Sequence, residues 1–152
     1  MPRFLTALAT VAALALPSLA TAQEVDPNVR ARQSLMTLYA YNLGVLGGMA
    51  QGRMPYDAEA AAAAATSLYH ASRSGSARMW PAGSDNGAMQ GTRALPAIWQ
   101  NMDDFGSRFG ALQGATEAMM AAAGTDLAAL QGAMGPLGAA CGGCHQTYRQ
   151  AQ

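Results

Sequence analysis

Between residues 98 and 123, side chains suited to a protein core recur at alternating steps of four and three residues. The positions are Ile98, Met102, Phe105, Phe109, Leu112, Thr116, Met119 and Ala123. Over more than three heptads, this spacing is typical of a helix that packs one face against other helices. The segment therefore predicts one long helix, ended by Gly124, in a helical bundle.

Three further segments carry helical signals. In the first segment, the residues expected on the inner face include one polar residue, Arg32. The apolar residues of this face are Val29, Met36, Tyr39, Leu43, Leu46 and Ala50. The second is an alanine-rich run that Asp57 caps and Gly75 stops, with an inner face of Ala61, Ala65 and Leu68. The last starts at Thr125 or Asp126, and its inner stripe is Leu127, Leu130, Met134, Leu137, Cys141, Cys144 and Tyr148.

These segments and their connections define the fold class that we expect. The chain is rich in alanine, methionine and leucine, which favours helix over strand. Residues 74–96 are dense in Gly, Ser, Pro and Asn and predict a long crossing loop. We predict an all-α antiparallel four-helix bundle, an architecture that builds cofactor sites between facing helices. Its many glycines weaken isolated helices, so the fold is expected to depend on tertiary packing or on a bound group, which a large apolar cofactor would supply.

The first 22 residues read as a signal peptide. Arg3 precedes an apolar run that is too short to span a bilayer, and Ala20 to Ala22 form an A-x-A cleavage pattern. Residues 23–152 then form one domain, exported and without a later membrane span, which predicts the periplasm. Nine arginines, no lysine and nine acidic residues give no basic patch for nucleic acid or an anionic membrane.

The stretch CGGCH near the C-terminus holds both cysteines and one of the two histidines. Cys141, Cys144 and His145 lie at i, i+3 and i+4, so a helix presents them on one face. C-x-x-C-H is the attachment signature of haem c, in which the thiols add to the haem vinyl groups and the imidazole binds iron. A disulfide here would constrain little chain, a thioredoxin-like pair needs an α/β context, and zinc needs four ligands.

The whole of residues 25–150 resembles the cytochrome c′ family, the class II c-type cytochromes. The resemblance rests on RQSLM in the first helix, PYDAEA in the second, LPAIW in the third and GPLGAACGGCHQTYR in the fourth. It implies one haem c per chain, held by thioether bonds to Cys141 and Cys144. It also implies His145 as the proximal iron ligand and a basic residue, Arg149, beside the haem.

Arg32 and Trp80 match positions near the haem in this family. The resemblance places Arg32 near a haem propionate, and a guanidinium on an inner stripe does need an acceptor. The alternative for Arg32 is a side chain that extends to solvent at the bundle end. Trp80, in the crossing loop, either forms a wall of the distal pocket or anchors the loop.

Met36 decides between two functions. Low-spin relatives have methionine at this position as the sixth iron ligand, whereas high-spin members leave the iron five-coordinate. Methionine also fills cores without any further role, which is the alternative for Met36. His70 lies outside the inner face of its helix and is expected at the surface.

The resemblance and Met36 together predict a one-electron carrier, not an enzyme, that serves unidentified redox partner proteins. The alternative is a five-coordinate protein that binds nitric oxide or carbon monoxide. A weak peroxidase has no distal acid or base motif to support it. A homodimer through the first two helices is also expected from the family, with Gly44, Gly47 and Gly48 allowing close approach either to a second chain or within one chain.

Overall fold

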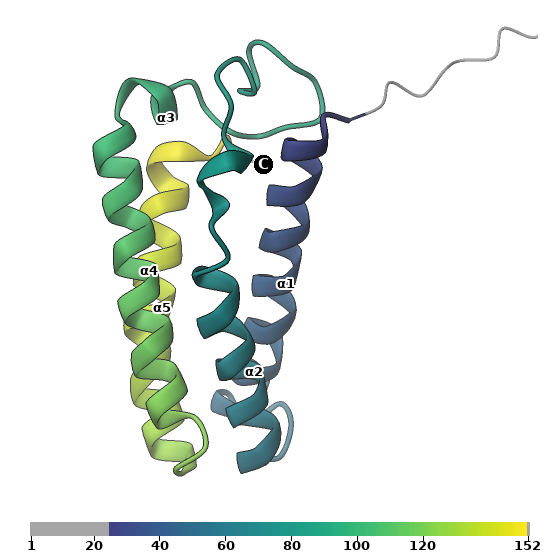
Figure 1. Cartoon of the computed structure of the whole chain (residues 1–152). Coiled ribbons are helices and arrows are strands. Elements are labelled where there is room, and N and C mark those ends of the chain that lie inside the picture. Colours follow the sequence, from purple (N-terminus) through teal and green to yellow (C-terminus); the bar gives the residue numbers. More distant parts are fainter. Residues whose placement is uncertain (1–24, 152) are drawn as a thin grey trace, which may run out of the picture.

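Residues 25–151 are described by the computed structural model, and they form an antiparallel bundle of four long helices (Figure 1). The long helices are α1 (Pro27–Ala50), α2 (Ala58–Ser72), α4 (Met102–Ala122) and α5 (Leu127–Tyr148). Helix α1 packs against α2 and α5, and α4 packs against the same two helices. The predicted all-α four-helix bundle is thus confirmed, while the predicted signal peptide lies outside the described residues.

Aspartates define where three of the long helices begin. The Asp26 carboxylate accepts from the backbone N–H of Asn28 at 2.8 Å, Asp57 accepts from Ala60 at 2.9 Å, and Asp126 accepts from Ala129 at 2.8 Å. Each carboxylate satisfies a backbone donor that has no partner within the helix. The sequence-based starts at Asp57 and Asp126 are therefore confirmed.

The core lies along the bundle axis between the four helices. Its largest apolar side chains are fully buried, and they are Leu46 from α1, Leu68 from α2, Met119 from α4, and Leu130 and Leu137 from α5. The predicted inner face of α2, Ala61, Ala65 and Leu68, is buried as expected. Within residues 25–151, no helix has the length and apolar character needed to cross a membrane.

The helix predicted over residues 98–123 is broken near its start. A short helix, α3 (Ala97–Gln100), ends at Asn101, whose backbone (φ −140°) is not helical, and α4 begins after it. The Asn101 side chain donates to the Ala97 carbonyl, a local bond of the kind that competes with helix formation. Consequently Met102, which we expected in the core, is 47% exposed.

Two other core predictions need correction. Leu127 is 37% exposed because it is the first residue of α5 and lies at the end of the bundle. On α1, Leu35 and Asn42 are buried, whereas the predicted positions one residue later, Met36 and Leu43, are only half-buried. Both of the latter side chains pack against the core cluster and also line a cavity.

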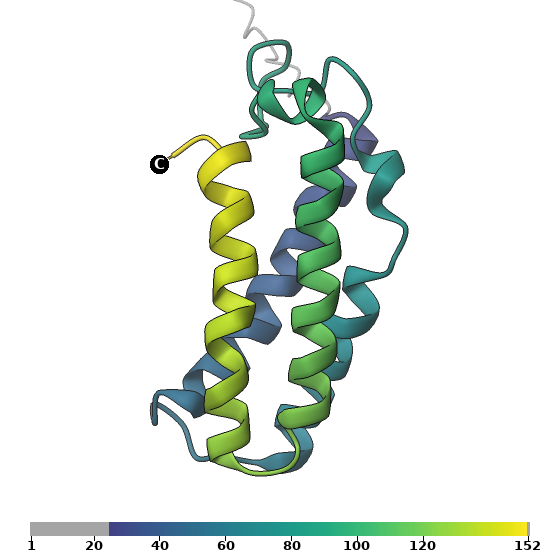
Figure 2. The same cartoon turned by 90° about the vertical axis from the view of Figure 1, so that its left-hand side faces the viewer.

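The crossing loop passes over one end of the bundle, as Figure 1 shows. It contains one short 3-10 helix, η1 (Ser76–Met79), and ends in a β-bridge between Ala94 and Arg149. Backbone bonds from Leu95 to the Tyr148 carbonyl (3.0 Å) and from Gln150 to the Arg93 carbonyl (2.9 Å) attach it to the end of α5. Figure 2 shows α5 beside α4, with the C-terminus at the loop-covered end of the bundle.

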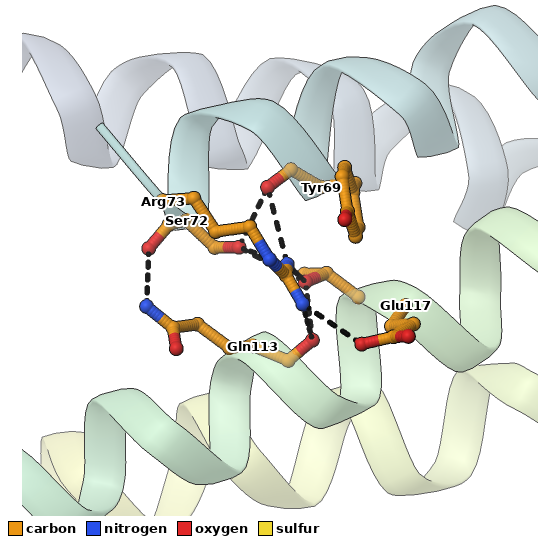
Figure 3. Close-up of polar contacts among 6 residues, drawn as sticks. Tyr69, Ser72, Arg73, Gln113 and Glu117 are labelled. Atoms are coloured by element: carbon orange, nitrogen blue, oxygen red, sulfur yellow. Dashed lines mark hydrogen bonds and ion pairs between the residues drawn. The ribbon is translucent and has the colours of Figure 1, made fainter.

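Arg73 connects α2 to α4 (Figure 3). Its guanidinium donates to the main-chain oxygen of Gln113 at 3.2 Å and to the Glu117 carboxylate at 2.9 Å. It also lies over the Tyr69 ring, 3.8 Å from the centroid. In return, the Gln113 amide donates to the Ser72 carbonyl at 3.1 Å, so the C-terminal end of α2 is fixed to the middle of α4.

Candidate cofactor site

The C-terminal turns of α5 present the C-x-x-C-H residues to one cavity. Cys141, Cys144 and His145 are half-buried, and all three line it. Both cysteines are free thiols. Burial raises the pKa of Cys141, and burial also raises the pKa of Cys144, although Arg108 partly opposes this. Redox-active C-x-x-C pairs have a lowered thiol pKa, so this environment argues against that interpretation.

The cavity has a volume of about 450 Å³, within the usual range of about 300–1,000 Å³ for cofactor and ligand sites. Four parts of the chain enclose it. Three are the helices α1, α4 and α5, and the fourth is the crossing loop together with the short helix α3. Its apolar lining consists mainly of Met36, Ala40, Leu43, Trp80, Ile98, Phe105, Phe109, Leu112 and Ala140. The site is therefore large, apolar and closed on several sides.

Met36 and His145 line this cavity from two different helices. Met36 follows Arg32 by one helical turn on α1, and His145 precedes Arg149 by one turn at the end of α5. All four residues line the cavity, and the two helices run antiparallel. The cavity thus holds a thioether and an imidazole supplied by two antiparallel helices.

Arg32 is buried, with 3% of its surface exposed, so the alternative of a side chain that extends to solvent is wrong. One terminal nitrogen donates to the Met79 carbonyl and the Ser84 hydroxyl, and the other donates to the Ser84 carbonyl and the Thr92 hydroxyl. These four bonds use all the N–H donors of the two terminal nitrogens. Burial lowers the pKa of Arg32, and Asp26 opposes this in part. From the sequence we had expected a carboxylate as the acceptor for Arg32. The crossing loop supplies its acceptors instead.

Trp80 both forms a wall of the cavity and anchors the loop. Its ring lies edge-on to Phe105 at 4.8 Å between centroids, and the Arg32 guanidinium lies 4.6 Å from the ring centroid. Its backbone carbonyl accepts from the Trp99 indole at 3.2 Å. The Trp80 indole N–H is buried without a hydrogen-bond partner in the described structure. Trp99 thus helps to hold the loop.

Basic side chains surround the loop-covered end of the cavity. Arg149 lines it as predicted, and Arg93, which sequence analysis did not identify, joins it from the crossing loop. Burial lowers the pKa of His145, and Arg149 and then Arg93 lower it further. A neutral imidazole is the form that binds metal. No periodic pattern marks Arg93, because it lies in an irregular segment.

Tyr39 is the second residue that the sequence did not identify as part of the site. It was expected on the inner stripe of α1, and its side chain is indeed 6% exposed. It also lines the cavity, and its hydroxyl has no hydrogen-bond partner in the described structure. Burial, and next the nearby Cys141, raise the pKa of Tyr39 to about 12.

A polar cluster joins α4 to α5 beside Cys144. The Tyr148 hydroxyl donates to the Asp104 carboxylate at 2.6 Å, and Arg108 donates to the same carboxylate at 3.1 Å. These hydrogen bonds, Tyr148 first, lower the pKa of Asp104. The cluster fixes the helix turn that carries Cys144.

His70, the second histidine of the chain, is exposed, as predicted, and does not line the cavity.

A helical bundle with a C-x-x-C-H turn facing an apolar cavity defines a c-type cytochrome of the bundle class. Residues 27–149 match the family model for cytochrome c′, and the chain belongs to this family. Cytochrome c-554 of Cereibacter sphaeroides is 49% identical over 142 residues, which are 93% of this chain and 93% of that protein.

Solved structures agree with this assignment. Cytochrome c′ from Rhodobacter Spheriodes has a TM-score of 0.80 at 35% identity, over 82% of this chain and 96% of that chain. A nitric oxide complex of a mutant of cytochrome c prime from Alcaligenes xylosoxidans has a TM-score of 0.71 at 32% identity, over 82% and 94%. The chain is thus similar both to a cytochrome c-554 and to cytochromes c′.

The residues present fit the covalent haem c of this family. The cavity provides two thiols and an imidazole from one helix face, and its walls are apolar. Two buried donors on these walls, the Tyr39 hydroxyl and the Trp80 indole N–H, have no partner in the described structure. Unpaired buried donors are uncommon, so a group with acceptors in the cavity accounts for them.

Proposed function

We propose that this protein carries single electrons, with haem c joined by thioether bonds to Cys141 and Cys144. In this proposal His145 and Met36 bind the iron from opposite sides. The observation that carries it is that Met36, on α1, lines the same cavity as His145, on α5. The family's low-spin relatives have methionine at this place.

The bound haem supplies a one-electron couple between ferric and ferrous iron. The chain's own residues would then set its properties. The Met36 sulfur, a soft ligand, favours the ferrous form, and burial lowers the pKa of His145, which favours the neutral imidazole. Apolar side chains such as Phe109 and Leu112 limit the access of water to this site. Two axial ligands from rigid helices leave little to rearrange when the charge changes.

The basic end of the cavity supports a place for the haem propionates. Arg149 and Arg93 line that end, and carboxylates pair well with arginine. We propose Arg149 as a proximal neighbour of the haem and Trp80 as a wall of the distal side. Arg32 has committed its terminal donors to the loop, so only its remaining N–H is left for a propionate.

We place this carrier in the periplasm, where it would exchange electrons with partner proteins and catalyse no reaction of its own.

We also propose a homodimer through α1 and α2. Leu38 is 44% exposed on α1, and nothing lies within 4 Å of a Cβ built on Gly44, which supports an approach at this face. A Cβ on Gly48, by contrast, would lie 2.8 Å from the sulfur of Met54 within the same chain.

A second candidate function is the binding of nitric oxide or carbon monoxide to five-coordinate iron. The nitric oxide complex of the related cytochrome c prime favours it. Met36 is half-buried beside open cavity space, so a packed methionine that does not bind iron is the alternative arrangement.

Replacing Met36 by alanine tests which function applies. We expect the haem-loaded Met36→Ala protein to lose a six-coordinate, low-spin spectrum and to bind carbon monoxide. Met102→Ala is the matched control, since Met102 is exposed and outside the cavity. A Met36→Ala spectrum identical to that of the wild type would exclude Met36 as a ligand.

A further inference from the structure

Tyr39 holds a hydrogen-bond donor that the protein does not use. Its side chain is 6% exposed, it lines the haem cavity, and its hydroxyl has no partner in the described structure. Leaving a buried donor without an acceptor is unfavourable for the folded state. Because the rest of the side chain is enclosed by the core, the missing acceptor belongs to a group within the cavity.

Two residues that line the same cavity carry sulfur atoms that are candidate acceptors for this hydroxyl, Met36 and Cys141. Tyr39 follows Met36 by three residues, so their side chains are neighbours on α1. Aromatic side chains in a helix lean back over the preceding turn, which here carries Met36. Cys141 lies on α5 and lines the same cavity. A thioether sulfur accepts a hydrogen bond, though a weak one.

We propose that the Tyr39 hydroxyl donates a hydrogen bond to the Met36 sulfur when this sulfur binds the iron, which makes Tyr39 a positioning residue that raises the reduction potential. The inference rests on the proposed function, because it takes Met36 as the sixth ligand. A donated hydrogen bond withdraws electron density from the sulfur, and ferric iron depends on that density more than ferrous iron does. Hydrogen bonds to metal ligands tune metal centres in this way.

Tyr39→Phe removes only the hydroxyl, and Tyr41→Phe is its matched control. Tyr41 lies on the same helix but is 70% exposed and does not line the cavity. Both variants and the wild type are purified with covalent haem, and three quantities are compared. These are the reduction potential, the far-red sulfur-to-iron absorption band and the midpoint of thermal unfolding.

We expect Tyr39→Phe to lower the potential, with the reduction equilibrium constant falling roughly two- to tenfold, the effect of one net hydrogen bond. The far-red band should shift in the same variant, and Tyr41→Phe should change neither quantity. If the wild type shows the far-red band and Tyr39→Phe has the same reduction potential and the same band, the inference is overturned. The proposed function then remains intact. A wild type that lacks the band and binds carbon monoxide would overturn the proposed function, and the inference with it.

Discussion

Arg32 donates a hydrogen bond to the Ser84 hydroxyl at 2.8 Å, and so joins the first helix to a loop residue 52 positions later in the chain. The same guanidinium lies over the ring of Trp80, which forms a wall of the haem cavity. One buried cation thus holds the crossing loop against the cavity. The position of the loop depends on α1 as well as on its attachment to α5.

Replacing Arg32 by alanine is therefore expected to destabilise the haem-loaded protein by about 2–3 kcal/mol, because buried acceptors on Ser84 and Thr92 lose their donor. Arg32→Lys should recover little of this, since one ammonium group has three donors at a single nitrogen and cannot reproduce four hydrogen bonds from two nitrogens. Denaturant unfolding measures the loss. Arg78→Ala, an exposed arginine in η1, is the control. Equal stability of the Arg32 and Arg78 variants would contradict this role.

The contacts of Arg73 predict that replacing Arg73 lowers the free energy of unfolding more than replacing its ion-pair partner Glu117 does. Arg73→Ala should lower the free energy of unfolding by about 1–2 kcal/mol, because the link to the Gln113 carbonyl and the stacking on Tyr69 are lost. Glu117→Gln should cost less than about 0.5 kcal/mol, because the Glu117 side chain is 65% exposed. Comparable losses in both variants would mean that the ion pair, and not the main-chain link, joins the helices.

Asp104 predicts a loss of stability in acid. Its pKa is lowered in the folded state by the hydrogen bond from Tyr148 and by Arg108. A lowered folded-state pKa stabilises the fold above the unfolded-state pKa, and this contribution is lost as the pH falls through the folded-state pKa. Asp104→Asn should therefore reduce the pH dependence of unfolding below about pH 4.

Denaturant unfolding of the wild type and of Asp104→Asn, at intervals between about pH 6 and pH 2, measures this difference. Asp103→Asn changes the neighbouring exposed carboxylate and is the control. If Asp104→Asn and Asp103→Asn unfold with the same pH dependence, the cluster around Asp104 does not stabilise the fold.

Covalent attachment predicts what happens to the haem when cysteines are removed. Acidified organic solvent should extract no haem from the wild type, and none from Cys141→Ala or Cys144→Ala alone, because one thioether remains. The double variant should release all its haem. Extraction from the wild type would contradict attachment at these residues. Cysteine-to-alanine variants that fail to fold are recognised beforehand by circular dichroism.

Much of this fold could be predicted because its signals are local. The alternation of core positions, the aspartate caps and the C-x-x-C-H spacing each depend on neighbours within one helix turn or two. They correctly placed Leu68, Met119 and Leu137 in the core and Cys141, Cys144 and His145 on one cavity wall. Family resemblance added Arg149 and Trp80, which also line that cavity.

The parts that sequence could not give depend on contacts distant along the chain. The loop acceptors of Arg32 lie 47 to 60 residues away from it, so no local pattern encodes them. The break at Asn101 interrupts a spacing that by itself favours one continuous helix. Tyr39 looked like an ordinary core residue, because only the packed structure reveals that its hydroxyl lacks a partner.

The central claim is that Met36 and His145 complete the coordination of the iron and make this protein an electron carrier. The visible absorption spectrum of the ferric and ferrous wild-type protein at neutral pH, with and without carbon monoxide, tests it most directly. The account predicts low-spin bands, a weak far-red sulfur-to-iron band in the ferric form and no response to carbon monoxide. A high-spin spectrum that changes on addition of carbon monoxide would contradict it and would favour a gas-binding protein.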